Sequence, residues 1–514
     1  MNGAEALIRT AIASGVDVCF ANPGTTEMHL VAALDAAPGM RAVLALFEGV
    51  VTGAADGYAR MTGKPALTIT HLGPGFANGI ANLHNARRAN TPVVNLIGDQ
   101  ATWHLAADAP LTSDIDSLAS PVSIWVRKAK TPAECAPLLA EGIALSRRAP
   151  GGVATLIVPA DCAWGETPGP AKPVAVEPAP AVRGEQIDAA AQALRSGEPA
   201  LILLGANALS VQGSRAAARV AARSGARVMY GTFPARVDRG AGLPAFQKFP
   251  YLPEQGVDLL AKVKHLVLAG ALEPVAFFGY PNLPSRLAPP GCRISVLATP
   301  EDDAAGTLEA LASALGAGPN EGEVAPRAEL APASGKLTPE LLGRTLARLQ
   351  PEGAIVVDEA ATSGAPWFAF AAGAPPHASL GLTGGAIGQG LPNAVGAAIA
   401  CPDRRVISLQ ADGSGMYTLQ SLWTAARESL DVKVIVCANR MYRILKVELA
   451  RADIKEPGPA ARQLTDLAPP PLDWVALARG MGVPGERVET AEDLAAALGR
   501  AFADRGPYLV EAGL

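Results

Sequence analysis

Short apolar runs that alternate with helical patterns constrain this fold most. In the first third of the chain, "RAVLALF", "PALTIT" and "PVVNLIG" are such runs, and segments with helical periodicity separate them. The alternation returns in the middle ("ALILLG", "HLVLAG") and near the end ("RVISLQ", "VKVIVCA"). Near-continuous apolar strands suit parallel sheets that helices cover on both faces. The sequence therefore predicts an α/β protein built from doubly wound parallel sheets.

The length of the chain and two linker-like stretches predict its domains. A chain of 514 residues is too long for one hydrophobic core. Stretches rich in Pro or broken by Pro begin at Trp164 and Gly316, and such composition is typical of linkers. We therefore expect three doubly wound domains, at residues 1–165, 183–318 and 337–514.

Composition excludes several classes of protein. The net charge of -5 and the lack of a Lys/Arg-rich run argue against nucleic-acid binding. The first residues lack the pattern of a signal peptide, and no apolar run reaches membrane-spanning length. Six cysteines without paired spacing suggest neither a disulfide framework nor a zinc site. A cytoplasmic enzyme that does not bind membranes is the expectation.

Two polar residues follow consecutive predicted strands near the C-terminus. Asp412 comes after "RVISLQ", and Asn439 comes after "VKVIVCA", with a helical pattern over residues 417–428 between them. In a right-handed strand-helix-strand unit both strands run the same way. Asp412 and Asn439 then lie side by side at the carboxyl edge of the sheet, where open α/β sheets bind ligands.

These two side chains suit a magnesium ion and its phosphate ligands. Mg²⁺ takes oxygen ligands and usually completes its octahedron with phosphate oxygens and water. The turn "DGS" at Asp412 also opens a helix, whose first N–H groups attract anions. The alternative is architectural, because Asp commonly caps a helix and Asn commonly ends a strand.

The stretch resembles the diphosphate and metal motif of thiamine-diphosphate-dependent enzymes, and the closest resemblance is to acetolactate synthase-like large subunits. The family motif is Gly-Asp-Gly followed, after about two dozen residues, by Asn-Asn; here it reads Ala411-Asp412-Gly413 and Ala438-Asn439. The resemblance implies Mg²⁺ ligands from Asp412, Asn439 and the carbonyl of Met441. Ala411 would be strained only if its position needs positive φ. The resemblance also makes the three domains pyrimidine-binding, central and diphosphate-binding.

The same resemblance places the catalytic carboxylate in "ALFEGVVTGAADGYARMTG". There Glu48 would hydrogen-bond the aminopyrimidine of the cofactor and so prepare its proton relay. Taken alone, Glu48 is also a plain first-turn carboxylate of a helix, where the macrodipole favours it. In the family, one subunit supplies this glutamate and another supplies the diphosphate site. A homodimer or homotetramer is therefore implied.

Other cofactor contacts follow from the resemblance. In "LTGGAIGQGLP", Ile387 would support the bent cofactor and the carbonyl of Gly385 would accept from its amino group. The loop that starts at Asp358 resembles a diphosphate-side loop, although any Gly-containing strand-to-helix loop looks similar. The remaining implied cofactor contacts are Glu359, Gly413, Ser414, Met441 and Tyr442. No motif supports FAD, which stays open.

The residues expected near the substrate resemble those of two different enzymes. The loop at Gly73 resembles that of acetolactate synthases, whereas His71 and Thr25 fall where benzoylformate decarboxylase has a histidine and a serine. An imidazole suits proton transfer near neutral pH, although a histidine at a strand end is often structural. The decarboxylase's second histidine has no counterpart in "LEPVAFFGYP".

A second substrate-side segment follows the metal motif. Ile444 and Glu448 would line the substrate pocket from the helix after residue 442. The alternative is that Glu448 pairs with Lys446 or Arg451 on a solvated face.

These residues favour one predicted activity and leave two alternatives open. The resemblance implies an acetolactate synthase-like enzyme that decarboxylates a 2-oxo acid and then transfers or releases the resulting acyl carbanion. The first alternative is a benzoylformate decarboxylase-like enzyme that releases an aldehyde. The second is a catalytically silent subunit that only binds the cofactor. The sequence does not give the acyl group, because fold and cofactor do not fix the pocket.

Overall fold

The computed structural model describes residues 1–181 and 184–514. The predicted start of the central domain, residue 183, lies outside the described residues. The chain forms two compact units, which we describe separately. The first unit comprises Met1–Val176, Leu330–Phe370 and Leu382–Leu514, and the second comprises Glu177–Glu329 and Ala371–Gly381.

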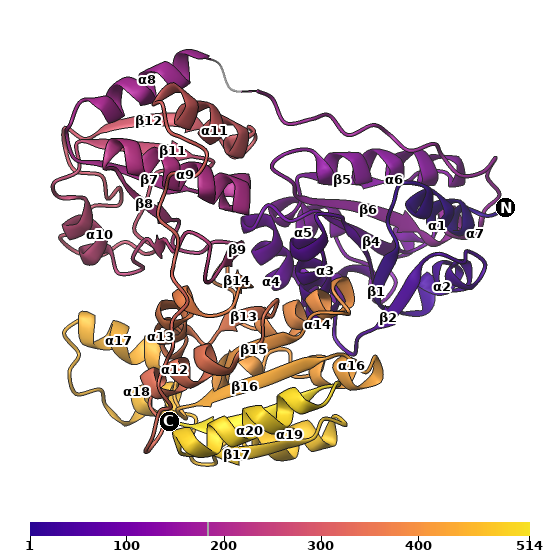
Figure 1. The fold of residues 1–514 in the computed structure, drawn as a ribbon. Helices are drawn as coiled ribbons and strands as arrows, with labels where there is room; N and C mark the ends of the chain where they lie inside the picture. Colours follow the sequence, from indigo (N-terminus) through magenta and orange to yellow (C-terminus); the bar gives the residue numbers. More distant parts are fainter. Residues whose placement is uncertain (182–183) are drawn as a thin grey trace. The chain divides into compact units, whose positions relative to one another are not determined.

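The N-terminal part of the first unit is a parallel sheet of six strands in the order β2-β1-β3-β4-β6-β5 (Figure 1). The order reverses direction along the chain, which defines a doubly wound sheet. Its strands are β1 (Val18–Asn22), β2 (Arg41–Leu44), β3 (Ala66–Thr70), β4 (Val93–Asp99), β5 (Trp125–Lys128) and β6 (Val153–Pro159). Its longer helices are α1 (Gly3–Ala13), α2 (Met28–Asp35), α3 (Glu48–Thr62), α4 (Leu72–Arg88) and α6 (Pro132–Arg147), with α5 (Ile115–Ala119) and α7 (Ala160–Trp164) shorter.

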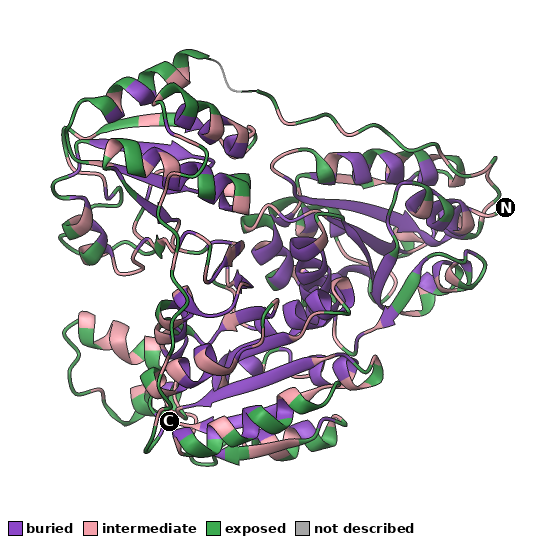
Figure 2. Ribbon diagram, viewed as in Figure 1, coloured by how far each residue is buried: buried purple, intermediate pink, exposed green. Residues whose placement is uncertain are grey.

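Burial explains the apolar runs of this sheet. Every residue of β3, β4 and β6 is buried (Figure 2). On one face, α1 and α6 pack against each other over a core that includes Leu7, Ile8 and Leu139. Strands covered on both faces cannot alternate apolar and polar residues, so their sequences read as continuous apolar runs.

The C-terminal part of the first unit holds a second parallel sheet, in which β17, β18, β16, β15 and β13 pair in that order. These strands are β13 (Ile355–Glu359), β15 (Val406–Ala411), β16 (Val432–Ala438), β17 (Gly485–Val488) and β18 (Tyr508–Gly513). The accompanying helices are α12 (Pro339–Leu349), α13 (Ala365–Phe370), α14 (Gly390–Ala400), α15 (Asp412–Gly415), α16 (Ser421–Arg427), α17 (Arg443–Arg451), α18 (Pro459–Thr465), α19 (Trp474–Gly480) and α20 (Ala491–Ala503).

The helix predicted over residues 417–428 is shorter than expected. It begins at Ser421 and ends at Arg427. The hydroxyl of Thr418 donates to the carbonyl of Gly388 at 2.9 Å, and Ser421 N closes a turn onto Thr418 O at 2.9 Å. The segment before Ser421 is therefore a turn tied to a neighbouring loop, and the apolar spacing at Leu419 was wrongly taken for helix.

Helices α3 and α14 join the two parts of the first unit. They pack side by side along small residues (Figure 1). A Cβ on Gly396 would lie 1.9 Å from the carbonyl oxygen of Ala54, and one on Gly57 would lie 2.2 Å from the carbonyl oxygen of Asn393. Only glycine permits backbones to approach this closely. Asn393 also donates to the Gly53 carbonyl at 3.1 Å, which satisfies a buried polar group.

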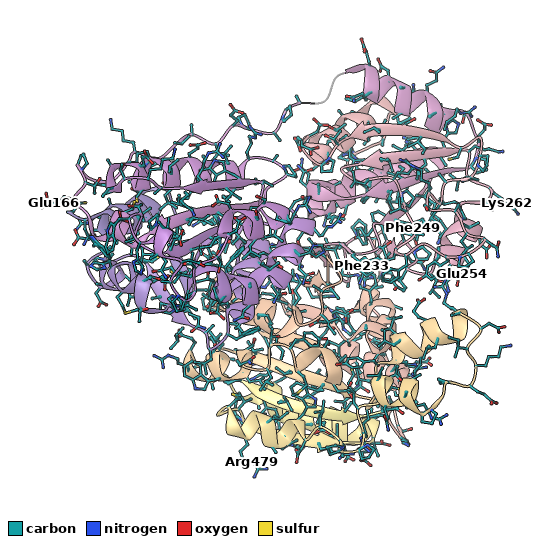
Figure 3. All side chains as sticks on the ribbon, turned by 180° about the vertical axis from the view of Figure 1, so that it is seen from behind. Glu166, Phe233, Phe249, Glu254, Lys262 and Arg479 are labelled. Atoms are coloured by element: carbon teal, nitrogen blue, oxygen red, sulfur yellow. The ribbon has the colours of Figure 1, made fainter. Side chains whose placement is uncertain are left out.

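The second unit contains a parallel sheet in the order β10-β8-β7-β11-β12. Its core includes Phe249 and Leu260, and Figure 3 shows Phe249 among other side chains, whereas Lys262 projects away. The strands are β7 (Ala200–Leu204), β8 (Arg227–Tyr230), β10 (Gln247–Lys248), β11 (His265–Ala269) and β12 (Arg293–Ala298), and β9 (Arg236–Arg239) pairs antiparallel with β14 (His377–Gly381). The helices are α8 (Gly184–Arg195), α9 (Val211–Ser224), α10 (Pro253–Leu260) and α11 (Ala304–Ala314).

The predicted fold class is confirmed: the described residues form three α/β sheets whose strand pairs are parallel except for β9 with β14. None of the helices in residues 1–181 and 184–514 is both long enough and apolar enough to cross a membrane.

Candidate active site

Asp412 and Asn439 follow neighbouring parallel strands, as the sequence predicts. Strands β15 and β16 pair in a register that sets Ala411 opposite Cys437. The backbone N–H of Arg440 donates to Asp412 Oδ2 at 2.6 Å, and the N–H of Gly413 donates to Oδ1 at 2.9 Å. The Asp412 carboxylate therefore lies against the backbone next to Asn439, at the carboxyl edge of the sheet.

The donor set at this edge fits a magnesium ion. Asp412 is 3% exposed, and burial raises the pKa of its carboxyl group. In the described part of the chain no Lys or Arg forms an ion pair with it, so a bound cation would offset the cost of the buried charge. Asn439 Oδ1 accepts from Met441 N at 3.0 Å, which orients the amide oxygen. Within the described residues no cluster of three or more His, Cys, Asp or Glu could hold a metal ion. The predicted ligands are of another kind, because they comprise one carboxylate, one amide oxygen and one backbone carbonyl.

The turn that carries Asp412 tolerates the departure at Ala411. Ala411 has φ -89° and ψ 148°, an extended conformation that any residue adopts. Gly413 is constrained instead, because a Cβ there would lie 2.5 Å from the ring of Tyr442. Ser414 lies in α15 and accepts from Gln410 Nε2 at 2.7 Å. Gly413, Ser414 and Tyr442 are thus brought together beside Asp412.

Glu48 is the first residue of α3 and is 7% exposed. Its Oε2 accepts from the side-chain amide of Asn78 in α4 at 3.0 Å. A Cβ on Gly75 would lie 2.9 Å from Oε1, so glycine keeps that side of the carboxylate clear. A first-turn position therefore coincides with a buried, specifically bonded carboxylate, and the two readings of Glu48 are compatible.

The loop with Gly385 and Ile387 lies against helix α4. The amide of Asn82 donates to the carbonyls of Gly49, at 2.8 Å, and Gly388, at 3.2 Å. Two further bonds link Asn85 to Ala386, at 2.7 and 3.2 Å. Gly385 (φ 79°) and Gly388 (φ 95°) adopt left-handed conformations that favour glycine. Two asparagines of α4, Asn82 and Asn85, thus bind the loop of Ile387, and Asn82 also binds the residue after Glu48.

The two acidic residues at the end of β13 differ in environment. Asp358 is half-buried, and its Oδ1 accepts from Ala360 N at 3.2 Å. Glu359 is buried, and its carboxylate accepts from the backbone of the Ile387 loop. The Glu359 side chain therefore faces the loop, where its bonds are with protein donors.

His71 has a buried carboxylate partner that the sequence analysis missed. Its Nδ1 lies 2.8 Å from Glu27 Oε2, and Glu27 is 0% exposed. Glu27 also accepts from the N–H of Gly24 at 2.8 Å and from the hydroxyl of Thr26. Nδ1 donates to the Glu27 carboxylate in the tautomer or imidazolium that has its proton there, and Nε2 is then left for other partners. The acidic residue in "NPGTTE" was the available signal.

The backbone beside His71 is strained. Leu72, which opens α4 and is fully buried, has φ 46°. Such a conformation is rare for residues other than glycine and is commonly held in place at functional sites.

Comparisons with known proteins match two parts of the chain to one family. Residues 1–119 match the thiamine pyrophosphate enzyme N-terminal TPP binding domain, and residues 366–512 match the C-terminal TPP binding domain. The chain belongs to the thiamine pyrophosphate enzyme family. The predicted family resemblance is thereby confirmed.

Individual relatives of this thiamine pyrophosphate enzyme span its whole length. It is 50% identical to the Mycobacterium tuberculosis protein named "Putative acetolactate synthase large subunit IlvX", over 99% of this chain and 98% of that protein. It is 30% identical to benzoylformate decarboxylase of Pseudomonas aeruginosa, over 97% and 96%. The solved structure of the Rhodococcus jostii RHA1 thiamine diphosphate-dependent 4-hydroxybenzoylformate decarboxylase superposes with a TM-score of 0.86, at 26% identity, over 99% of this chain and 98% of that one.

A cavity of about 280 Å³ opens beside Thr25 in this thiamine pyrophosphate enzyme. Thr26, in the same wall, has its hydroxyl 3.3 Å from His71 Nδ1. His29 and His104, which the sequence did not mark as candidates, line this cavity. The lining includes Thr25, Thr26, His29, Trp103, His104 and Trp164.

Ile444 and Glu448 lie one turn apart on α17. Glu448 forms an ion pair with Arg451 at 3.4 Å, which is one of the two alternatives weighed from sequence. Lys446 pairs with Asp466 instead. Both Ile444 and Glu448 are half-buried.

Proposed function

We propose that this thiamine pyrophosphate enzyme uses thiamine diphosphate and Mg²⁺ to decarboxylate a small 2-oxo acid. One observation carries the proposal: the buried carboxylate of Asp412 and the side chain of Asn439 follow neighbouring parallel strands, within the segment that matches the C-terminal TPP binding domain. That arrangement suits a metal ion that binds the diphosphate of the cofactor, and the buried Glu48 carboxylate lies in the segment that matches the N-terminal TPP binding domain.

The chain's own residues divide the work of holding the cofactor. Asp412, the side-chain oxygen of Asn439 and the carbonyl of Met441 would hold Mg²⁺. The diphosphate would lie by the turn of Gly413, Ser414 and Tyr442 and by Asp358. Gly385 and Ile387 would orient the pyrimidine, and Glu48 would hold its proton. When bound, thiamine diphosphate would supply the electron sink for the electron pair that the broken C–C bond leaves behind when CO₂ departs.

The substrate side uses a different set of residues. Thr25 would donate to the substrate carboxylate, and Nε2 of His71 would deliver or remove a proton while Glu27 fixes the ring. Ile444 and Glu448 would add to the pocket wall.

We propose acyl transfer to a second carbonyl compound as the fate of the decarboxylated unit. The support is the 50% identity to the protein named "Putative acetolactate synthase large subunit IlvX". Aldehyde release is the second candidate, favoured by the contact between His71 and the buried Glu27 carboxylate, which suits a proton donor. FAD has no part in either proposal.

Product analysis separates these candidates. The purified protein is supplied with thiamine diphosphate, Mg²⁺ and one of pyruvate, benzoylformate or a branched 2-oxo acid, with and without an aldehyde acceptor. A 2-hydroxy ketone or 2-hydroxy acid as main product supports transfer, and a free aldehyde supports release. No CO₂ from any acid would favour a silent cofactor-binding subunit.

We also propose a cytoplasmic homodimer or homotetramer in which two chains share each site. The test mixes Glu48→Gln and Asp412→Asn subunits, each inactive alone, after dissociation and reassembly. Shared sites restore part of the activity, because one kind of site in the mixed assembly carries neither change. If Glu48 and Asp412 of one chain form each site, mixing restores none.

A further inference from the structure

Glu359 binds the backbone of the Ile387 loop at three successive residues. Its Oε1 accepts from Gly388 N at 2.6 Å and from Gln389 N at 3.2 Å. Its Oε2 accepts from Gly390 N at 2.6 Å and from Gln410 Nε2 at 3.0 Å. Both oxygens therefore serve as acceptors for two donors each.

This carboxylate is deeply buried and lacks a cationic partner. Glu359 is 3% exposed, and in the described part of the chain no Lys, Arg or His forms an ion pair with it. Burial raises the pKa of the Glu359 carboxyl, and the four donors oppose that rise. A buried carboxylate is costly unless it is well bonded, so the donors and the carboxylate depend on one another.

A second link runs from Glu359 toward the metal turn. Gln410 Nε2, which donates to Glu359, also donates to Ser414 Oγ at 2.7 Å. Ser414 lies two residues after Asp412 in the same helical turn. One amide thus connects the carboxylate that holds the Ile387 loop with the turn that holds Asp412.

We propose that Glu359 is a positioning residue that fixes the Ile387 loop relative to the turn of Asp412 and Ser414, and so sets the separation between the pyrimidine and diphosphate subsites. This inference rests on the proposed function. It replaces the sequence-based expectation that Glu359 contacts the cofactor itself. Its carboxylate acts through the loop backbone, as groups behind a ligand set commonly do.

Glu359→Gln is the sharpest test. The amide replaces one acceptor oxygen with an N–H₂ group, and either orientation points that group at two donors. Asp431→Asn is the matched control. Asp431 is a half-buried carboxylate just before β16, at the amino edge of the same sheet, paired with Arg405 at 3.1 Å and Lys433 at 2.9 Å.

The readout is equilibrium binding of two probes to the whole protein in Mg²⁺: thiamine diphosphate and inorganic pyrophosphate. We expect Glu359→Gln to raise Kd for thiamine diphosphate about 10- to 100-fold, the range typical of losing an orienting group. Kd for pyrophosphate should change much less, because Asp412 and Asn439 are intact. Asp431→Asn should lower the thermal stability of the apo protein without changing either Kd.

Two results would contradict the positioning role of Glu359, and a third would contradict the proposed function on which it rests. Equal Kd values for thiamine diphosphate in wild type and Glu359→Gln would overturn the positioning role, as would equal weakening of both probes. Failure of the wild type to bind thiamine diphosphate would overturn the proposed function instead. If Glu359→Gln does not fold, Glu359→Asp, which keeps both acceptors on a shorter arm, provides the same comparison.

Discussion

Glu27 Oε2 lies 2.8 Å from Nδ1 of His71, and the two residues come from different crossovers of the N-terminal sheet. Glu27 is 0% exposed, so the contact holds the imidazole in one orientation beside Thr26. A ring fixed at Nδ1 presents Nε2, and that is the arrangement needed for directed proton transfer.

The first prediction concerns this pair. Glu27→Gln should lower kcat nearly as much as His71→Ala, and the double variant should be little worse than either, because residues that act as a unit are not additive. Stability should also fall by about 1–3 kcal/mol, since a buried donor loses its acceptor. Steady-state kinetics and urea unfolding check both effects. Glu141→Gln, whose carboxylate accepts from the Trp125 indole, is the control, and additive losses in the double variant would contradict the coupling.

The second prediction concerns Glu48. Glu48→Gln should reduce CO₂ release about 10²- to 10⁴-fold, the usual contribution of a positioned proton-transfer group. Its Kd for Mg²⁺ and pyrophosphate should stay near the wild-type value, because Asp412 is untouched. Coupled assays and calorimetry give the two numbers. Full activity in this variant would refute the assigned mechanism.

The third prediction concerns the metal site. Asp412→Asn should abolish the Mg²⁺ dependence of cofactor binding, and chelation of Mg²⁺ from the wild type should reproduce that loss. The reason is that one of two proposed side-chain ligands loses its charge. Asp431→Asn should keep the metal response of the wild type. An unchanged Mg²⁺ titration in Asp412→Asn would place the ion elsewhere.

The fourth prediction concerns the contact between α3 and α14. Gly396→Ala should destabilise the protein by about 1–3 kcal/mol or more, because the added methyl would meet the Ala54 carbonyl and force the helices apart. Gly499→Ala in α20, where nothing lies within 4 Å of the new Cβ, should instead stabilise by about 0.5–1 kcal/mol. Denaturant unfolding compares the two. Similar effects at both positions would show that α14 can shift.

The fifth prediction concerns pH. The hydrogen bond from Arg500 lowers the pKa of Glu486, and Tyr508 adds a second donor. A lowered carboxyl pKa means that the unfolded chain binds the proton more readily. The contribution is therefore present above the ordinary value of 4.5 and lost as the pH falls through the lower folded value. Unfolding free energies from pH 7 down to pH 3 should fall more steeply for the wild type than for Glu486→Gln, and parallel curves would contradict the assignment.

The amino-acid sequence by itself determined the features that depend on neighbouring residues. Apolar runs fixed the strands of the parallel sheets, and strand ends placed Asp412 and Asn439 at one edge, because parallel neighbours end together. The sequence also located Glu48 at the start of a helix. It misread residues 417–420, where a bond from Thr418 to a distant loop ends the helix early.

Only the tertiary structure decided which distant groups meet. Glu27 reaches His71 across 44 residues, Glu359 holds Gly388 across 29, and Asn82 donates to Gly388 across 306. Periodicity carries no information about such pairs, since each depends on how crossovers and packed helices bring strand ends together. Because these groups are buried, the fold depends on the contacts. A buried carboxylate or amide without its partner would remove a large part of the small free energy of unfolding.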